Sequence, residues 1–545
     1  MNIKHKFLAA LLAVRITAVP LAGCGSQAEA AAAAASTTAV TTTSVATDST
    51  LSEYFTERDL SGDYDESEAT LITLTGSSAE TDGSGVTVSG GTITITEEGT
   101  YLISGTLEDG QIVVEADDAA KVQIVLDGVS ITNDDSACIL ILSADKVFIT
   151  LAEGSENTLS DTGATYTQQS SDYTVDGVIF SREDLTINGT GSLTVNAGYQ
   201  HGIVGKDDLK LVSASITVQA AGKGIAANDS IRIASGSYTV DSADDALHTS
   251  NSDEDGKGYI YIADGTFDLS TGDDGIHAAT DLIIDGGSIL IDQSYEALEG
   301  LTITINSGEI DVTASDDAMN ASSGSSSEES SSQNSGYVMD DHNGMGGGMM
   351  NEIEQDASLT INGGEIVVNA GGDGLDSNGT LTVTGGTVIV NGPTNDGNGA
   401  LDCGLGATIS GGTVIAAGSS GMAETFGADS TQYSILYNFS GTVSAGTTVT
   451  LTDADGNEVM SYEAVKDMTS ILFSCDAITD GTYTITAGSQ FDTVTVSSVS
   501  TTGGTGGGMR MGGMQGPGGM QQGQGGQMPQ QSQSGQMPQQ GQPKF

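Results

Sequence analysis

The chain has 545 residues and a formal net charge of −58, because 73 Asp and Glu stand against only 15 Lys and Arg. Such a charge argues against nucleic-acid binding, since a phosphate backbone would be repelled. Four cysteines are too few for a disulfide-stapled scaffold, and the chain has no apolar run of the roughly 18 residues that a polytopic membrane protein needs. Hydrophobic residues still make up 37% of the chain, so a folded core is expected.

The N-terminus resembles an export signal. Two lysines precede an apolar run over residues 7–14, which is too short to span a bilayer. Leu21-Ala22-Gly23-Cys24 resembles the lipobox of bacterial lipoproteins, although Arg15 departs from the usual pattern. We predict a lipoprotein signal peptide over residues 1–24, lipidation at Cys24, and an extracellular protein anchored to the bacterial membrane only by lipid. A plain signal peptide is the alternative.

A linker and a repeat follow the signal. Residues 25–50 are mostly Ala, Thr and Ser, which predicts a flexible tether. From residue 177 a small residue followed by an aliphatic one recurs about every 22 residues, as in Gly202-Ile203 and Gly224-Ile225. Each repeat also carries two alternating apolar runs, which are typical of half-buried strands. Three short strands per repeat predict an all-β fold, a right-handed parallel β-helix whose coils share one core; an array of β-sandwiches is the alternative.

The repeat sets the expected domain boundaries. We predict a β-helix over residues 51–432, interrupted by a disordered Ser-, Gly- and Met-rich insertion over residues 321–356. Helical signals are nearly absent. Residues 433–500 predict a small antiparallel β unit that closes the end of the solenoid. Residues 501–545, rich in Gly, Gln and Met, predict a disordered tail. Cys138, Cys403 and Cys475 predict buried free thiols.

Acidic residues recur at fixed offsets around the small-aliphatic pairs. Equivalent positions in a β-helix stack ~4.8 Å apart, and each like-charged pair at ~5 Å costs about 0.8 kcal/mol in water, more if buried. Ca²⁺ takes six to eight oxygen ligands with flexible geometry, so several calcium ions are expected; His248 and His277 could indicate zinc, but the carboxylate-rich surroundings favour calcium. A solvated acidic face is the alternative. The predicted metal ligands are Asp244, Asp245, Asp273, Asp274, Glu296, Glu299, Asp316, Asp317, Asn320, Asp373, Asp376 and Asp402.

A family resemblance rests on several motifs between residues 51 and 495. They include Gly99-Thr100-Tyr101-Leu102-Ile103-Ser104-Gly105, Val122-Gln123-Ile124-Val125-Leu126-Asp127-Gly128-Val129 and the Asp-Asp-Gly and Asp-Asp-Ala units. With these motifs the chain resembles the carbohydrate-binding-domain family of bacterial parallel β-helix proteins. The resemblance implies a pectate-lyase-like fold, calcium bound by aspartates at coil turns, and binding of cellulose or pectin-like acidic polysaccharide.

Three functions remain open at this point. The first is a non-catalytic, calcium-dependent, monomeric binder of acidic or cellulosic polysaccharide, whose candidate ligand-binding residues are Tyr199, His201, Lys206, Lys223 and Tyr295. Tyr238, Tyr259 and Tyr261 could also stack on sugar rings. The second is a calcium-dependent pectate lyase, which needs a base; Lys206, Lys223 and Lys257 are the candidates. The third is a calcium-stabilised surface adhesin without a sugar ligand.

Overall fold

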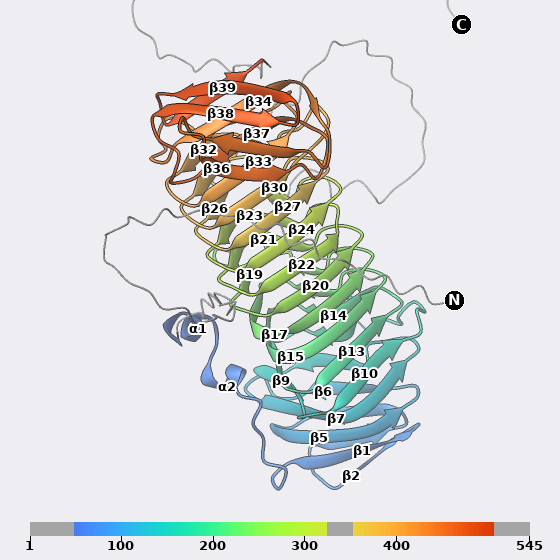
Figure 1. Cartoon of the computed structure of the whole chain (residues 1–545). Helices are drawn as coiled ribbons and strands as arrows, with labels where there is room; N and C mark the ends of the chain where they lie inside the picture. Colours follow the sequence, from blue (N-terminus) through green and yellow to red (C-terminus); the bar gives the residue numbers. More distant parts are fainter. Residues whose placement is uncertain (1–47, 169, 324–352, 506–545) are drawn as a thin grey trace, which may run out of the picture. The chain divides into compact units, whose positions relative to one another are not determined.

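The computed structural model describes residues 48–323, except 169, and 353–505. Within these residues the chain winds through successive coils whose strands form three parallel ladders (Figure 1). This arrangement confirms the predicted all-β parallel β-helix. The predictions for the signal peptide, for Cys24 and for most of the linker, the insertion and the tail fall outside the described residues.

The first ladder carries the small-aliphatic pairs of the repeat. Its strands pair in parallel from coil to coil, with Ile225, Leu247 and Ile276 in register. Its members are β4 (Thr92–Ile95), β6 (Gln111–Glu115), β8 (Ile139–Ser143), β11 (Gly177–Ser181), β14 (His201–Gly205), β16 (Ile225–Ala227), β18 (Leu247–Thr249), β21 (Ile276–Ile284), β23 (Leu298–Ile305), β25 (Met319–Ala321), β28 (Leu375–Ser377) and β31 (Leu401–Cys403).

The second ladder follows the first along each coil and bends away from it. The long strands β21 and β23 continue from the first ladder into the second. The other members are β5 (Gly99–Leu107), β7 (Lys121–Asn133), β9 (Lys146–Leu151), β12 (Leu185–Gly189), β15 (Asp208–Ala220), β17 (Ser230–Ser242), β19 (Tyr259–Ile262), β26 (Ser358–Ile361), β29 (Thr380–Val383) and β32 (Gly406–Ile409).

The third ladder closes each coil. It takes the second halves of β7, β15 and β17, which cross a corner from the second ladder. The remaining members are β10 (Glu156–Asp161), β13 (Ser192–Ala197), β20 (Thr266–Thr271), β22 (Ser288–Gln293), β24 (Glu309–Ala314), β27 (Glu365–Ala370), β30 (Thr387–Asn391) and β33 (Thr413–Gly418).

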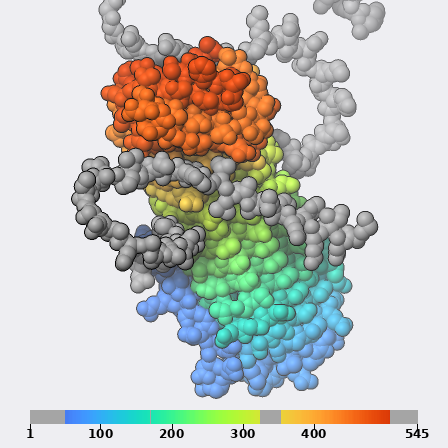
Figure 2. All heavy atoms as spheres, viewed as in Figure 1, coloured from blue at the N-terminus to red at the C-terminus, as the bar shows by residue number. Residues whose placement is uncertain are grey.

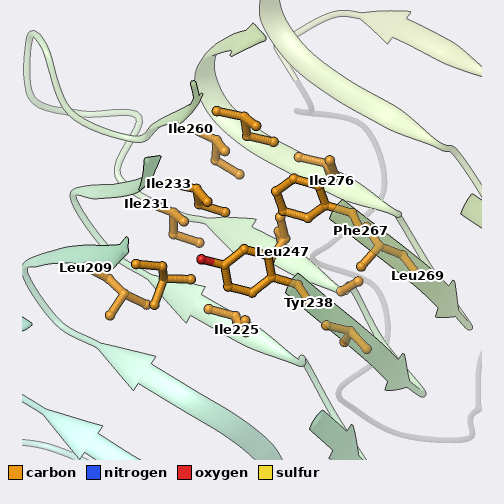
Figure 3. Packing of buried hydrophobic residues seen from close by; sticks show 14 of the residues in the cluster. Leu209, Ile225, Ile231, Ile233, Tyr238, Leu247, Ile260, Phe267, Leu269 and Ile276 are labelled. Atoms are coloured by element: carbon orange, nitrogen blue, oxygen red, sulfur yellow. The ribbon is translucent and has the colours of Figure 1, made fainter. Parts of the chain in front are cut away.

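One side chain in two on each strand points into the coil. Figure 3 shows how Ile225 and Leu247 of the first ladder meet Ile231 of the second and Tyr238 of the third in one continuous core. Because each coil leaves its flat apolar face open, stacking is what buries these side chains. Cys138, Cys403 and Cys475 are buried and form no disulfide, as predicted.

Both ends of the solenoid depart from the parallel repeat. At the N-terminal end, β2 (Ala79–Thr81) pairs antiparallel with β1 (Thr70–Gly76), and β3 (Val86–Ser89) pairs antiparallel with β4. At the other end, β37 (Met468–Ser474) pairs antiparallel with β33, so the C-terminal strands continue the last coil. They lie directly against the coils in the space-filling view (Figure 2). These pairings occupy strand edges that would otherwise template aggregation.

The C-terminal unit has its own core of buried side chains, which includes Val449, Tyr462 and Phe473. Its other strands are β34 (Ser434–Val443), β35 (Thr448–Thr452), β36 (Glu458–Glu463), β38 (Gly481–Ala487), β39 (Gln490–Val496) and β40 (Ser500–Gly504). Strand β40 pairs in parallel with β34, so the predicted start of the disordered tail at residue 501 is wrong. The free edge of β34 gives these glycine-rich residues a backbone hydrogen-bonding partner.

Helix is scarce in the described residues, as the sequence indicated: two short helices lie within residues 48–60. Helix α1 (Asp48–Tyr54) begins inside the predicted linker, and α2 (Glu57–Leu60) lies at the start of the range predicted for the β-helix, before its first strand. Thr56 and Asp59 form a capping box at α2. Asp59 is fully buried and binds the ammonium groups of Lys146 at 2.6 Å and Lys210 at 3.3 Å. These contacts fix the helical segment on the outer face of the second ladder.

Candidate functional site

The acidic residues form two columns along the first ladder. The turn column comprises the residues two positions before each inward aliphatic side chain: Lys223, Asp245, Asp274, Glu296, Asp317 and Asp373. The strand column comprises the outward residues that stack in register from β16 to β31: Ala226, His248, His277, Glu299, Asn320, Asp376 and Asp402. The predicted stacking of carboxylates is therefore present.

The turn column has a structural role that the sequence did not reveal. Asp245 Oδ1 accepts the backbone N–H of Asp274 at 3.0 Å, and Asp274 Oδ1 accepts that of Glu296 at 3.2 Å. Asp317 and Asp373 repeat the pattern with the backbone of the following coil, each at 2.5 Å. One carboxylate oxygen thus joins consecutive coils, while the other is left for a side chain or an ion.

Protein cations neutralise the first half of the columns. The Lys223 ammonium contacts Asp245 and lies 3.4 Å from Asp244 Oδ1. His248 Nδ1 lies 2.7 Å from Asp245 Oδ2, but burial lowers the pKa of His248, so this ring is a neutral hydrogen-bonding partner of Asp245 and not a cation. His277 Nδ1 lies 2.5 Å from Glu299 Oε2 and 3.3 Å from Asp274 Oδ2. Although burial opposes a charged imidazole, these two carboxylates raise the pKa of His277 to about 10, so it is an imidazolium.

The second half of the columns has no such cation. Within the described residues, no Lys, Arg or His forms an ion pair with Asp317, Asp373 or Asp376. Burial, reinforced by repulsion between these carboxylates, raises the pKa of Asp317 to about 6, of Asp373 to about 7 and of Asp376 to about 8. Asp376 is 9% exposed, and its buried Oδ1 meets no hydrogen-bonding partner.

These features fit a hard cation bound from outside. The buried oxygen of Asn320 on the neighbouring coil also lacks a partner, and Asp402 stacks on Asp376 from the other side. Native proteins rarely leave buried polar atoms unsatisfied without a water or ion that the coordinates omit. Carboxylate and amide oxygens are the ligands that Ca²⁺ prefers, so the side-chain chemistry of Asp317, Asn320, Asp373, Asp376 and Asp402 suits calcium. Among the described residues, however, the acidic and histidine ligand atoms that lie within 4.8 Å of one another in groups of three belong to earlier coils: Asp244, Asp245 and Asp273, and Asp274, His277 and Glu299.

The remaining predicted metal ligands lie in other surroundings. Asp244, Asp245 and Asp273 bring one carboxylate oxygen each within 4.8 Å of one another, close to Lys223. Burial, with repulsion from Asp274 second, raises the pKa of Asp273 to about 6. Asp316 accepts a hydrogen bond from Tyr295. Glu296 accepts one from Asn320 Nδ2 at 3.0 Å, and burial raises its pKa to about 9.

A cationic pocket lies beside the start of the columns, with a cavity volume of about 180 Å³. It brings together His201, Lys206 and Lys223, three of the predicted ligand-binding residues, and adds His248. Val204 and Ala226, which are small or apolar outward residues of β14 and β16, also line it, and the rest of the lining is Asp176, Gly205, Ala227, Asn228 and Ser250. The Lys206 side chain is 42% exposed, and its ammonium lies 3.7 Å from Oδ2 of Asp176, another pocket residue. Sequence reasoning missed His248 as a pocket residue, because it considered this histidine only as a possible zinc ligand.

The ring of His201 presents a donor to this pocket. Its Nδ1 accepts the backbone N–H of Lys223 at 2.8 Å. Burial lowers the pKa of His201, so the ring is neutral, and an acceptor at Nδ1 places the proton on Nε2. His201 is therefore a hydrogen-bond donor toward a ligand, not a base.

Two predicted ligand-binding tyrosines lie outside the pocket. Tyr199 packs on Tyr166, with ring centroids 4.6 Å apart, and Tyr295 is 48% exposed on a later coil. The proposed sugar stacking by Tyr238 and Tyr261 is wrong. Tyr238 points into the core, where it stacks on Phe267, and Tyr261 lies buried beneath Tyr54 of α1. Alternation with inward Val240 marked Tyr238 as a core residue in the sequence.

The candidate lyase bases differ in their surroundings. Lys257 lies 2.8 Å from Asp229 Oδ2 and 3.1 Å from Glu254 Oε2, and these carboxylates raise its pKa. Lys223 is held by Asp244 and Asp245. Ammonium groups paired in this way have no lone pair with which to remove a proton. Lys206 is the most loosely paired of the three.

Within the described residues, no helix is both long and apolar enough to cross a membrane.

Comparisons with known proteins agree with the resemblance noted in the sequence. Residues 89–326 match the family model described as carbohydrate-binding domain-containing protein. A protein of the same description from Acetivibrio thermocellus is 45% identical over 136 residues, which are 25% of this chain and 48% of that relative. The chain thus spans about half of that relative's length. A solved polysaccharide lyase-like protein from C. thermocellum, a gadolinium derivative, is 36% identical over 41% of this chain and 91% of its own, with a TM-score of 0.40.

Proposed function

Because the chain belongs, through residues 89–326, to the carbohydrate-binding domain-containing family, we propose that it binds an acidic polysaccharide without cleaving it. The observation that carries the proposal is the cationic pocket. A chain of net charge −58 gathers Lys206, Lys223 and the His201 donor in one cavity, inside the matched segment. Such a group of donors suits the carboxylate of a uronate.

The size of the pocket supports an extended ligand. Its volume of about 180 Å³ is below the roughly 300 Å³ at which pockets for drug-sized molecules begin. It therefore suits one carboxylate-bearing sugar of a longer chain. The rest of the polymer would follow the first ladder along the acidic columns, where its negative charge needs a bridging cation.

Calcium would supply that bridge. Asp317, Asn320, Asp373, Asp376 and Asp402 would hold it, since no Lys, Arg or His of the described residues forms an ion pair with Asp317, Asp373 or Asp376, and Asp376 Oδ1 and Asn320 Oδ1 are buried without a partner. Bound Ca²⁺ offsets the repulsion between carboxylates and can accept a sugar carboxylate as a further ligand. The same ion would make glycan binding sensitive to chelators.

Titration of polygalacturonate in calcium tests this proposal. Lys206→Ala removes a partly exposed ammonium of the pocket, and we expect affinity to fall at least ~10-fold, since a hydrogen bond to a charged group contributes ~1.5–3 kcal/mol. Lys121→Ala is the matched control, because Lys121 is 48% exposed and paired with Asp145 at 3.4 Å, far along the chain from the pocket. Equal affinity of both variants, or no binding by the wild type, contradicts the proposal.

A pectate lyase is the second candidate, and the exposure of Lys206 inside the pocket is the observation that favours it. β-Elimination would leave an unsaturated product that absorbs in the ultraviolet. Incubation of the same protein with polygalacturonate and calcium therefore separates the two functions. Accumulation of this product by the wild type, but not by Lys206→Ala, would contradict the binding-only proposal and favour a lyase that uses Lys206.

A further inference from the structure

The C-terminal unit has a pocket of its own, with a cavity volume of about 340 Å³. It lies between β34 and the hairpin of β38 and β39, outside the segment that matches the family model. Its volume exceeds the roughly 300 Å³ at which pockets for small ligands begin. This aromatic pocket is lined by three aromatic side chains and one carboxylate, those of Tyr437, Phe439, Phe491 and Asp492, and its other lining residues are uncharged.

The three rings give the aromatic pocket apolar walls. Tyr437 and Phe439 lie two residues apart on β34, with ring centroids 4.9 Å apart and an angle of 74° between the rings, so they form a corner. Both rings are almost completely buried, whereas Phe491 of β39 is 78% exposed. A single exposed ring needs no explanation, but this ring lines a cavity together with two others. A ligand that entered the cavity would therefore contact aromatic carbon on more than one side.

The carboxylate of Asp492 lies among these rings without a protein cation. Tyr437 Oη donates to Asp492 Oδ2 at 3.0 Å, and the backbone N–H of Thr493 donates to Oδ1 at 2.8 Å. Burial, reinforced by Asp492, raises the pKa of Tyr437 to about 12, so its hydroxyl stays a donor at neutral pH. Within residues 48–323, except 169, and 353–505, no Lys, Arg or His forms an ion pair with Asp492. The two hydrogen bonds thus orient the carboxylate but leave its charge without a counter-ion.

We infer that the aromatic pocket binds a quaternary ammonium ion, an organic cation whose nitrogen carries methyl groups. Aromatic rings attract such cations through the electron-rich faces of the rings, and Asp492 supplies the opposite charge. A metal ion is disfavoured, because one carboxylate among rings cannot provide the six to eight oxygens of a calcium site.

The charge of the whole chain restricts the ligand further. A net charge of −58 concentrates cations near the protein and repels anions, so a quaternary ammonium joined to a phosphate should bind less well than one without it. The inference goes beyond the proposed acidic-glycan function, since it concerns another part of the chain and a ligand of the opposite charge.

Calorimetric titration of the protein with choline tests the inference. We expect saturable binding of choline, and at least ~10-fold weaker binding of its neutral isostere, in which a tert-butyl group replaces trimethylammonium. Phosphocholine carries the same ammonium beside a phosphate, and it should also bind more weakly than choline. This comparison separates a free cation from a lipid headgroup as the source of the ligand.

Variants of the lining assign the binding to the aromatic pocket. Phe491→Ala removes the exposed ring and should weaken choline binding at least ~5-fold, whereas Phe491→Tyr keeps a ring and should retain it. Asp492→Asn keeps an acceptor for Tyr437 but removes the charge, and should also weaken binding at least ~5-fold. Asp480→Asn is the matched control, because Asp480 is an exposed carboxylate beyond the other end of the same hairpin. It should bind choline like the wild type.

The contrary outcomes are distinct. Absence of choline binding by the wild type, equal affinity for the neutral isostere, or undiminished affinity of Phe491→Ala overturns the inference. A loss in Asp480→Asn equal to that in Asp492→Asn would reveal a general effect of charge and also overturns it. Dimers of the wild type that Phe491→Ala abolishes in sedimentation, without choline binding, assign the pocket to a second copy of the chain instead. Polygalacturonate titration of these variants should match the wild type, so failure of the acidic-glycan function is recognised separately.

Discussion

Replacement of Asp376 by asparagine should change stability in opposite directions with and without calcium. At pH 7 without calcium, an unfolded aspartate with its ordinary pKa of 3.8 is ionised, whereas burial beside Asp317 and Asp373 raises the folded pKa to about 8 and keeps the group protonated. About 1.4 kcal/mol per pH unit over roughly three units gives ~4 kcal/mol of lost stability. The asparagine amide stays buried without a full set of partners, so Asp376→Asn should recover ~2 kcal/mol.

With calcium bound, the same substitution removes a ligand and should lower the free energy of unfolding. A ligand at one hundred times its dissociation constant contributes ~2.7 kcal/mol to the folded state, so the loss should approach this value. Urea unfolding at pH 7, in chelator and in millimolar calcium, measures both signs. Asp268→Asn, which removes an exposed outward carboxylate from β20, is the matched control and should have little effect in either condition.

The pH dependence of stability provides a second test of the raised carboxylate pKa values. An acid whose folded pKa is raised binds more protons in the native state, so calcium-free wild-type protein should lose stability as the pH rises from about 4 to 8. Calcium should abolish most of that loss. If Asp376→Asn is equally destabilising in chelator and in calcium, or if calcium leaves wild-type unfolding unchanged, the carboxylates of this half bind no ion.

Two further predictions concern the N-terminal part of the chain. Asp59→Asn should lower the free energy of unfolding by ~3–5 kcal/mol at pH 7, because Lys146 and Lys210 would be left buried beside each other without a counter-charge; urea unfolding measures this, and a change below ~1 kcal/mol contradicts it. Cys24→Ser should release the exported protein from the membrane fraction into the medium, since the proposed lipid anchor is then lost; membrane retention of the variant contradicts the lipoprotein prediction.

The columns were predictable because a solenoid converts sequence period into spatial register. Residues one coil apart, such as Asn320 and Asp376, must stack once the strands around them pair. Contacts that do not follow the period gave no such signal. Asp59 lies 87 residues before Lys146 and 151 before Lys210, and only the folded chain reveals that a short helix delivers its carboxylate to both.

The sequence also concealed how charge is distributed along the columns. The aspartates in the first and second halves look alike in the sequence, yet Lys223 and His277 serve as internal cations for one half only. These basic residues occupy turn or strand positions that later coils fill with acid. One repeat therefore yields two kinds of surface along a single ladder: a segment already neutral, where the cationic pocket opens, and a segment that needs an ion. With calcium bound as proposed, an anionic polymer lying along this ladder would meet fixed positive charge at one end and exchangeable positive charge at the other, and its binding would be tunable by calcium without any change in fold.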